Sequence, residues 1–281
     1  MDIYPLRFNL GPLEITGFGM MMMFAFLGAG WVMERDLHRR QMSDEYAWSI
    51  IVAGAIGGIL GAKLWYFGLH QRWDALFSRA GLVWYGGFIG GVTAIIINSI
   101  RLKIPVRFTA ELAAPGLTIG YVLGRIGCFL VQDDYGGPSS LPWAMRFPQG
   151  EPPSTAQNLM AFRMEVPPGT SPFEVMAVHP TQLYESAIML IAFWAIWRLR
   201  FHRHAVGWLF GVYMIIAGVE RFLIEFLRAK DDRLLGSFTV AQLASLAVVA
   251  AGAVVLVKLQ DDDGKAKKLD AMILKPASAT R

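Results

Sequence analysis

Charge is scarce in this sequence: only 17% of its 281 residues are Asp, Glu, Lys or Arg, against roughly 25% in soluble globular proteins. Because hydrophobic residues make up 54% of the chain, a soluble fold would leave a large apolar surface in water. Cysteine is almost absent, and the single Cys128 excludes an internal disulfide and a zinc site built from cysteines. The composition therefore excludes most classes of soluble protein.

Patterns typical of cofactor sites are also missing. The sequence has no glycine-rich phosphate loop of the soluble type, no Ser/His/Asp arrangement and no carboxylates at metal-ligand spacing. We therefore expect no metal and no nucleotide cofactor. The formal charge is +4, but the basic residues come in short groups between apolar runs rather than in one patch, so nucleic acid is not an expected partner.

Seven uncharged apolar runs divide the chain, and a helix of about 20 such residues crosses a bilayer. The runs are 15–33, 46–62, 80–100, 112–124, 186–197, 205–219 and 234–257. The fourth, fifth and sixth runs are too short to span unless they include neighbouring polar residues. We expect an all-α integral membrane protein in which residues 1–258 form a domain of seven transmembrane helices.

Lys and Arg accumulate on one side of these runs. Fifteen of the 26 basic residues lie in the gaps after the first, third and fifth runs and in the tail, and eight are spread over the longer segments of the other side. Because short cytoplasmic loops are enriched in Lys and Arg, we expect the N-terminus outside and the C-terminus inside. Residues 259–281 are predicted to form a disordered, basic cytoplasmic tail.

Two segments lie on the outer side in this orientation. Residues 1–14 lack the basic leader, apolar core and cleavage site of a signal peptide, and they are predicted to form an outer arm or a surface helix. Residues 131–180 contain nine of the 14 prolines, and loops of this length are usually functional lids or small extra domains. We predict that this stretch folds over the outer end of the bundle.

Two arginines are expected near that outer end. Arg125 lies about 25 Å along the fourth span at about 1.5 Å per residue, and Arg221 lies about two thirds of the way along the sixth. Each carries a planar fork of donors suited to phosphate, and together they would hold a phospholipid headgroup. Two alternatives stay open: Arg125 snorkels to the interface, or Arg221 is neutralised by Glu225 at i,i+4.

Three further ionisable residues lie near the same end. His179 precedes Pro180, which places its ring at a helix entrance, where it either caps the fifth span or transfers a proton. Asp133 and Asp134 follow the fourth span and act either as a base or by ordering the outer loop. The outer end of the bundle is therefore the expected site of chemistry.

Five segments together resemble the prolipoprotein diacylglyceryl transferase family, in the order in which the family has them. They are 85–90 (YGGFIG), 124–136 (GRIGCFL followed by Asp133 to Gly136), 141–148 (LPWAMRFP), 179–185 (HPTQLYE) and 221–228, from Arg221 to Arg228. With the seven-span layout, the resemblance covers nearly the whole chain.

The resemblance implies an enzyme of the bacterial plasma membrane. Such enzymes move the diacylglyceryl group of phosphatidylglycerol to the lipobox cysteine thiol of preprolipoproteins and release glycerol phosphate, so the lipid, the lipobox peptide and membrane lipids are the expected partners. Arg125 and Arg221 match the family's two essential arginines. The other residues expected at the site are Tyr85, Asp133, Asp134 and His179 for catalysis, and Gly86, Gly87, Gln182, Tyr184, Glu225 and Arg228 for substrate binding.

Three positions depart from the family's pattern. Tyr85 stands where histidine is usual, Cys128 where asparagine is usual, and Phe18 where tyrosine is usual. Because a phenol of pKa about 10 is a poor base near neutral pH, we expect Tyr85 to donate a hydrogen bond to phosphate or glycerol oxygen. The thiol proton then goes to Asp133, Asp134 or His179, and we expect Cys128 to pack rather than to act as a nucleophile.

These departures leave two other interpretations. One is a phospholipid-binding or lipid-translocating paralogue that keeps the arginine cavity and has lost the transfer chemistry. The other, weaker one is an intramembrane lipid hydrolase. A transferase requires a lateral opening for lipid and a separate approach for a peptide, whereas a binding protein requires only the first.

Overall fold

Seven long helices are found among the residues described by this computed structural model, which are 1–260 except 12, 72, 74–82, 231–232 and 236–237. They are α1 (Gly17–Arg39), α2 (Glu45–His70), α4 (Trp84–Arg101), α5 (Val106–Val131), α7 (Thr181–Leu199), α8 (Trp208–Ile224) and α9 (Val240–Lys258). Each coincides with one of the seven predicted runs. Residues 261–281 of the predicted tail lie outside the described residues. So do residues 80–82, with which the third run begins.

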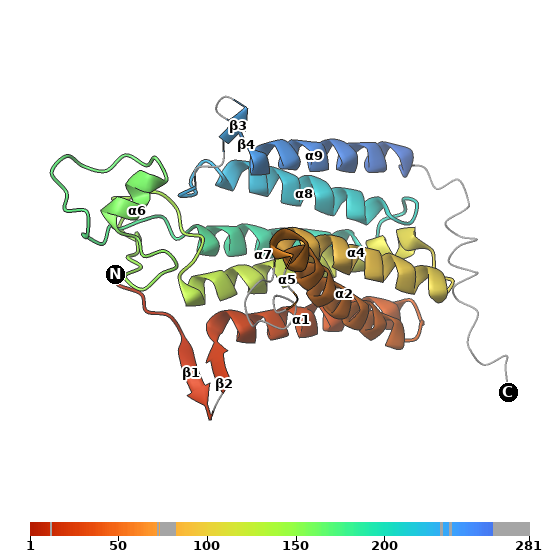
Figure 1. Ribbon diagram of the computed structural model, residues 1–281. Coiled ribbons are helices and arrows are strands. Elements are labelled where there is room, and N and C mark those ends of the chain that lie inside the picture. The colour runs from red at the N-terminus through yellow and green to blue at the C-terminus, as the bar shows by residue number, and fades with distance from the viewer. Residues whose placement is uncertain (12, 72, 74–82, 231–232, 236–237, 261–281) are drawn as a thin grey trace.

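Four of these helices, α1, α2, α5 and α9, are long and apolar enough to cross a membrane by length and composition. The chain is therefore an α-helical membrane protein. In Figure 1, α8 and α9 form one side of the bundle and α1 the other, with α5 and α7 between them. α5 packs mainly against α1, α7 and α8 and also contacts α4, so it links most of the long helices.

The predicted all-α fold also contains two short β-hairpins. β1 (Arg7–Leu10) pairs antiparallel with β2 (Leu13–Thr16), and β3 (Arg233–Leu235) pairs with β4 (Phe238–Thr239). Gly11, at φ +62°, adopts the left-handed conformation in which glycine is favoured at a chain reversal. The N-terminal arm is therefore a hairpin, and the alternative of a surface helix is wrong.

Residues 131–180 form a compact cap over one end of the bundle, on the left of Figure 1. Its core contains Tyr135, Phe147, Leu159 and Val178, all buried, and the rings of Tyr135 and Phe147 stack at 5.5 Å between centroids. The short helix α6 (Ala156–Ala161) lies within this segment. The predicted folding of this stretch over the bundle is confirmed.

Glycine allows α2 and α4 to pack backbone against backbone. A Cβ atom added to Gly61 would meet the carbonyl oxygen of Gly86 and lie 2.8 Å from the Cα of Gly90, which is closer than real Cβ contacts. Small residues permit this approach in membrane helices, where dispersion between close backbones stabilises association. The two glycine-rich helices therefore pack with their backbones in direct contact.

Replacing Gly61 with alanine is expected to destabilise the protein by about 1–3 kcal/mol, because the added methyl group overpacks a backbone contact. Gly68→Ala on the same helix is the matched control, since nothing lies within 4 Å of its added Cβ atom. Thermal unfolding in detergent should show a lower Tm for Gly61→Ala alone. Equal Tm values for the two variants would contradict the close contact.

Candidate functional site

Arg125 lies near the cap end of α5 and points into the protein. Its side chain is only 11% exposed, and its Nη1 group donates to Asp134 Oδ2 at 2.9 Å while Nη2 donates to Glu185 of α7. The sulfur of Cys128 lies 3.5 Å from the same Nη1 group. Two carboxylates thus hold this guanidinium inside the protein, rather than letting it snorkel to the surface.

Two more arginines join the same cluster, one from the last turn of α8 and one from the segment that follows it. Arg221 forms an ion pair with Glu225 at 2.6 Å, the i,i+4 pair considered from the sequence. Arg228 pairs with Asp134 and lies 3.9 Å from both Glu185 and Glu225. Asp134 therefore connects Arg125 to Arg228, and these five charged side chains with Glu185 make one continuous cluster, here called the arginine cluster.

The arginine cluster contains donors that have no acceptor. Arg125 Nε, Arg221 Nη1 and Arg228 Nε are buried and make no hydrogen bond with any described residue. Buried N–H groups are nearly always paired in folded proteins, and guanidinium donors favour carboxylate or phosphate oxygens. The arrangement therefore offers donors to a further anion.

Two residues that sequence reasoning did not select continue the cluster into the bundle. Tyr121, one turn before Arg125 on α5, donates its hydroxyl hydrogen to Glu185 Oε2 at 2.5 Å, and Glu220 Oε2 lies 3.3 Å from the same hydroxyl. Both glutamates are buried. An acidic residue beside Arg221 at the end of an apolar run was a usable signal for Glu220, but no sequence signal distinguished Tyr121.

The two cap aspartates differ in their proton affinity. Burial alone would raise the pKa of Asp134, but the charges of Arg228 and Arg125 outweigh burial and hold its pKa below the ordinary value. Burial, with the adjacent charge of Asp134, raises the pKa of Asp133, and Asp133 Oδ1 has no hydrogen-bond partner among the described residues. Asp133 is therefore the better proton acceptor near neutral pH.

Segment 179–185 supports the cap beside these aspartates. Gln182, fully buried, donates from Nε2 to the carbonyl oxygen of Asp133 at 2.5 Å. The Tyr184 hydroxyl accepts a hydrogen bond from the Trp143 indole at 2.8 Å and lies 3.4 Å from His179 Nδ1. Burial lowers the pKa of His179, so its ring is neutral at pH 7.

Tyr85 is not brought into the arginine cluster. It opens α4, its side chain is exposed, and its ring stands edge-on to Trp84 at 5.2 Å between centroids. Among the described residues, no hydrogen bond joins it to Arg125 or Arg221. Gly86 packs against Gly61 and Trp65, while an added Cβ on Gly87 would reach no atom closer than 3.5 Å. Packing against α2 thus accounts for Gly86 without a ligand.

One trio of potential metal ligands occurs at the site. The ligand atoms of Cys128, Asp133 and Asp134 all lie within 4.8 Å of one another. Asp134 already pairs with two guanidinium groups, and these positive charges oppose a cation at the same place. The electrostatics of the cluster therefore favour an anionic ligand over a metal ion.

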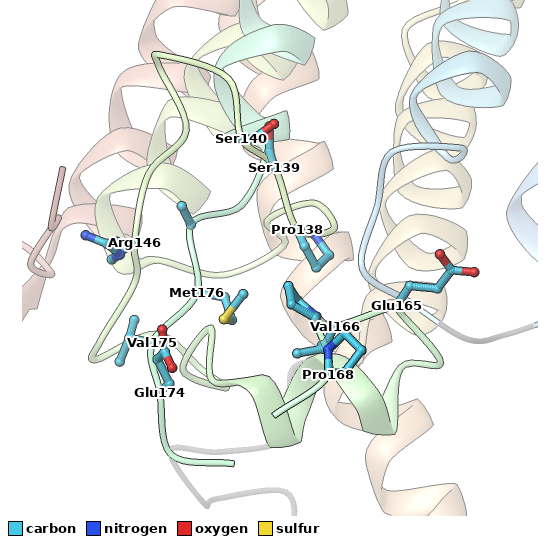
Figure 2. Close-up of a pocket in the computed structure, with 12 residues that line it drawn as sticks. Pro138, Ser139, Ser140, Arg146, Glu165, Val166, Pro168, Glu174, Val175 and Met176 are labelled. Atoms are coloured by element: carbon cyan, nitrogen blue, oxygen red, sulfur yellow. The ribbon is translucent and has the colours of Figure 1, made fainter. Parts of the chain in front are cut away.

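A cavity of about 570 Å³ lies within the cap, separate from the arginine cluster. Figure 2 shows Arg146 and Glu174 along one side of it and Glu165 on the other, with Met176 between them. The rest of its lining comes from prolines, from the hydroxyl groups of Ser139 and Ser140, and from the apolar side chains of Val166, Val175 and Ala177. This mixture of charged, hydroxyl and apolar groups suits an extended polar chain better than a lipid tail.

Comparison with known proteins gives a consistent result over nearly the whole chain. The family model described as prolipoprotein diacylglyceryl transferase matches residues 5–258. Relatives named phosphatidylglycerol–prolipoprotein diacylglyceryl transferase are 27% identical in Nitratidesulfovibrio vulgaris (89% of this chain and 91% of the relative) and 29% identical in Clostridium tetani (88% and 94%). The relative from Aeromonas salmonicida is 27% identical, with 91% and 90% covered.

Asp134→Asn tests the cluster through the pH dependence of stability. Because the pKa of Asp134 is lower in the folded protein than the ordinary value of about 3.9, its ion pairs stabilise the fold fully above that value. Their contribution is lost as the pH falls from about 4 through the lowered pKa. Thermal unfolding in detergent should show a lower Tm for Asp134→Asn at neutral pH and a smaller loss of Tm on acidification.

Asp2→Asn is the control for this measurement, because its exposed carboxylate lies 4.0 Å from Arg146 on the surface. Surface pairs of this kind contribute little, so Tm and its pH dependence should stay as in the wild type. If Asp134→Asn behaves in the same way as Asp2→Asn, the ion pairs of Asp134 do not stabilise the fold.

Proposed function

The chain belongs to the prolipoprotein diacylglyceryl transferase family, and we propose that it transfers the diacylglyceryl group of phosphatidylglycerol to the lipobox cysteine thiol of preprolipoproteins. The observation that carries this proposal is the set of buried arginine N–H groups without acceptors in the arginine cluster. A lipid phosphate would supply oxygen acceptors to these donors. The names of the relatives support the two substrates.

The proposal includes the arrangement in the bacterial plasma membrane. The seven long helices of residues 1–258 all span the bilayer, with the N-terminus and the cap outside and the basic tail inside. The distribution of Lys and Arg supports this orientation. A cap on the outer face meets preprolipoproteins after they have been exported, and the arginine cluster beneath it lies at the depth of the outer headgroups.

In the proposed reaction, the lipobox sulfur forms a bond to the glycerol carbon while the bond from that carbon to the phosphate oxygen breaks. The phosphate oxygen keeps the electron pair and leaves as glycerol phosphate. Arg125 and Arg221 bind the phosphate and stabilise this developing charge. Glu225 orients Arg221, from which its carboxylate lies 2.6 Å, and Arg228 offers its unpaired Nε donor to the phosphate.

Removal of the thiol proton is assigned to Asp133. Its raised pKa and the free oxygen of its carboxylate support this role, while Asp134 is committed to Arg125 and Arg228. His179, neutral and hydrogen-bonded to Tyr184, is the second candidate for proton acceptor. Gln182 positions Asp133 through its backbone, and Tyr184 holds His179, so both act on the substrate site through these neighbours.

We assign the cavity in the cap to the lipobox peptide. Its charged and hydroxyl lining fits an extended polar segment, and its position on the outer side matches the approach of an exported chain. The lipid and the peptide then reach the reacting atoms by different routes, which a transferase requires and a simple lipid-binding protein does not.

One experiment separates the transferase from a non-catalytic lipid-binding or lipid-translocating protein. The gene is expressed in bacterial cells depleted of their own diacylglyceryl transferase, and a reporter lipoprotein is analysed by mass spectrometry. Appearance of the diacylglyceryl modification supports the proposal. Correctly inserted protein without any modification would favour the non-catalytic alternative.

Arg125→Lys and Arg221→Lys keep the positive charge but lose the planar fork of donors. We expect each variant to lower lipid transfer by about 100-fold, the loss typical for removal of one well-placed donor to a developing anion. Arg7→Lys is the control, because Arg7 lies on the N-terminal hairpin and pairs with exposed Glu151. The measurement is the rate of diacylglyceryl transfer by each purified variant. A wild-type rate for Arg125→Lys would exclude the contact between Arg125 and the phosphate.

Tyr85 is assigned a neutral hydrogen bond to phosphate or glycerol oxygen on the resemblance alone. Tyr85→Phe should then lower the rate by about ten- to a hundredfold, and Tyr85→His should be tolerated. The measurement is the transfer rate from about pH 7 to 9, which should be flat in this range. A rate that rises steeply towards the ionisation of a phenol, and that is abolished in Tyr85→Phe, would instead make Tyr85 the base.

A further inference from the structure

Four side chains form a continuous line from the arginine cluster into the bundle. Arg125 contacts Glu185, the other oxygen of Glu185 accepts from Tyr121 at 2.5 Å, and the Tyr121 oxygen lies 3.3 Å from Glu220 Oε2. The line connects α5, α7 and α8. Tyr121 precedes Arg125 by four residues on α5, so its Cα lies about 6 Å further from the cap along the helix.

One hydrogen atom has to serve two contacts in this line. A phenol has a single hydrogen to donate, and its shorter contact commits that hydrogen to Glu185. The contact between Tyr121 and Glu220 is a hydrogen bond only if Glu220 is itself protonated and donates to the phenol oxygen. The other oxygen of Glu220 is buried without a hydrogen-bond partner, and no ion pair found among the described residues includes Glu220.

We propose that Glu220, Tyr121 and Glu185 form a proton relay that releases Arg125 to the lipid phosphate. This inference rests on the proposed function and adds the step by which the site accepts its substrate. When phosphate reaches Arg125, Glu220 passes its proton to the Tyr121 oxygen, and Tyr121 passes its own proton to Glu185. One O–H bond breaks at Glu220 and one forms at Glu185, so no proton enters from outside.

The Glu185 carboxylate and the lipid phosphate would compete for the Arg125 guanidinium, and the relay removes this competition. Glu185 is fully buried and already bound to Arg125, and a phosphate beside it would place two negative charges together in a medium of low dielectric. Protonation neutralises Glu185 and moves the negative charge to Glu220, which contacts Tyr121 rather than Arg125. Arg125 then turns its donors to the lipid without leaving a buried charge unpaired beside it.

Several charged and titratable groups surround Glu220 and determine whether the proton rests on Glu220 or on Glu185. Tyr121 and Arg125 face it from α5, Glu185 from α7, and Tyr213 and Arg221 from α8 itself. α9 packs against α8, but its only charged residue is Lys258, at its far end. The two arginines stabilise the charge when it arrives at Glu220, and Glu185 disfavours it until Glu185 has been protonated.

Glu220 and Tyr121 are positioning residues, and their variants should separate KM from kcat. Glu220→Gln still donates to Tyr121 but has no proton to release, and Tyr121→Phe interrupts the relay. We expect each to raise KM for phosphatidylglycerol roughly tenfold with little change in kcat, the equivalent of one weakened bond to a charged group. The double variant should be no worse than either single one, because both block the same relay.

A second substitution at Glu185 provides the sharper test. In the Glu220→Gln protein, Glu185→Gln removes the competing charge, so KM should return towards the wild-type value. Glu34→Gln is the matched control, since Glu34 lies on α1 and bonds to Trp48, and its KM should be unchanged. A KM for Glu220→Gln within about twofold of the wild type, or no recovery in the double variant, would overturn the relay.

Infrared spectroscopy decides the question even if a variant does not fold. Glycerol 1-phosphate is added to the wild-type protein, and the carbonyl stretching band of protonated carboxylic acid is followed. The relay predicts that this band shifts as the proton moves between two glutamates; an unchanged band would overturn it. Because this measurement needs no transfer, a wild-type protein that shows the shift but makes no product would exclude the proposed function and keep the relay.

Discussion

The bridge that Asp134 makes between Arg125 and Arg228 is the interaction on which the site depends. It ties the end of α5 to the segment after α8 and draws the start of the cap onto both. The two guanidinium groups are buried while the Asp134 carboxylate is 40% exposed, so desolvation of the arginines offsets much of the attraction and the net contribution to stability is modest. The network therefore acts by fixing geometry: the arginines can face a ligand only while the carboxylates hold them.

The same network explains why the site carries almost as many acids as bases. Three buried guanidinium groups alone would repel one another. Their desolvation would also destabilise the folded protein. Paired with Asp134, Glu185 and Glu225, they are close to neutral in sum, yet several of their donors are unpaired. The phosphate binding that we propose would therefore depend on directed donors rather than on an excess of positive charge.

Much of this structure was predictable from the sequence because a membrane restricts the choices. The seven apolar runs correspond to helices, since backbone groups in lipid have to be satisfied within the segment, and Arg125, Arg221 and Glu225 stood out as charges at membrane depth. The N-terminal hairpin was not predictable in this way, because it lies outside the runs and depends on the left-handed turn at Gly11. Tyr121 was missed because a tyrosine in an apolar helix is ordinary until a buried carboxylate is placed opposite it.

The backbone contact of α2 with α4 limits how this part of the chain can move. Helices separated by side chains can slide as rotamers change, but Gly61 against Gly86 leaves no side chain to yield. α2 and α4 therefore form one rigid unit. The pair joins α1 and α5 through the short connections at 40–44 and 102–105, where Gln41 and Lys103 hold left-handed backbone angles. A displacement of α2 and α4 as a unit would therefore have to change the backbone of these two connections.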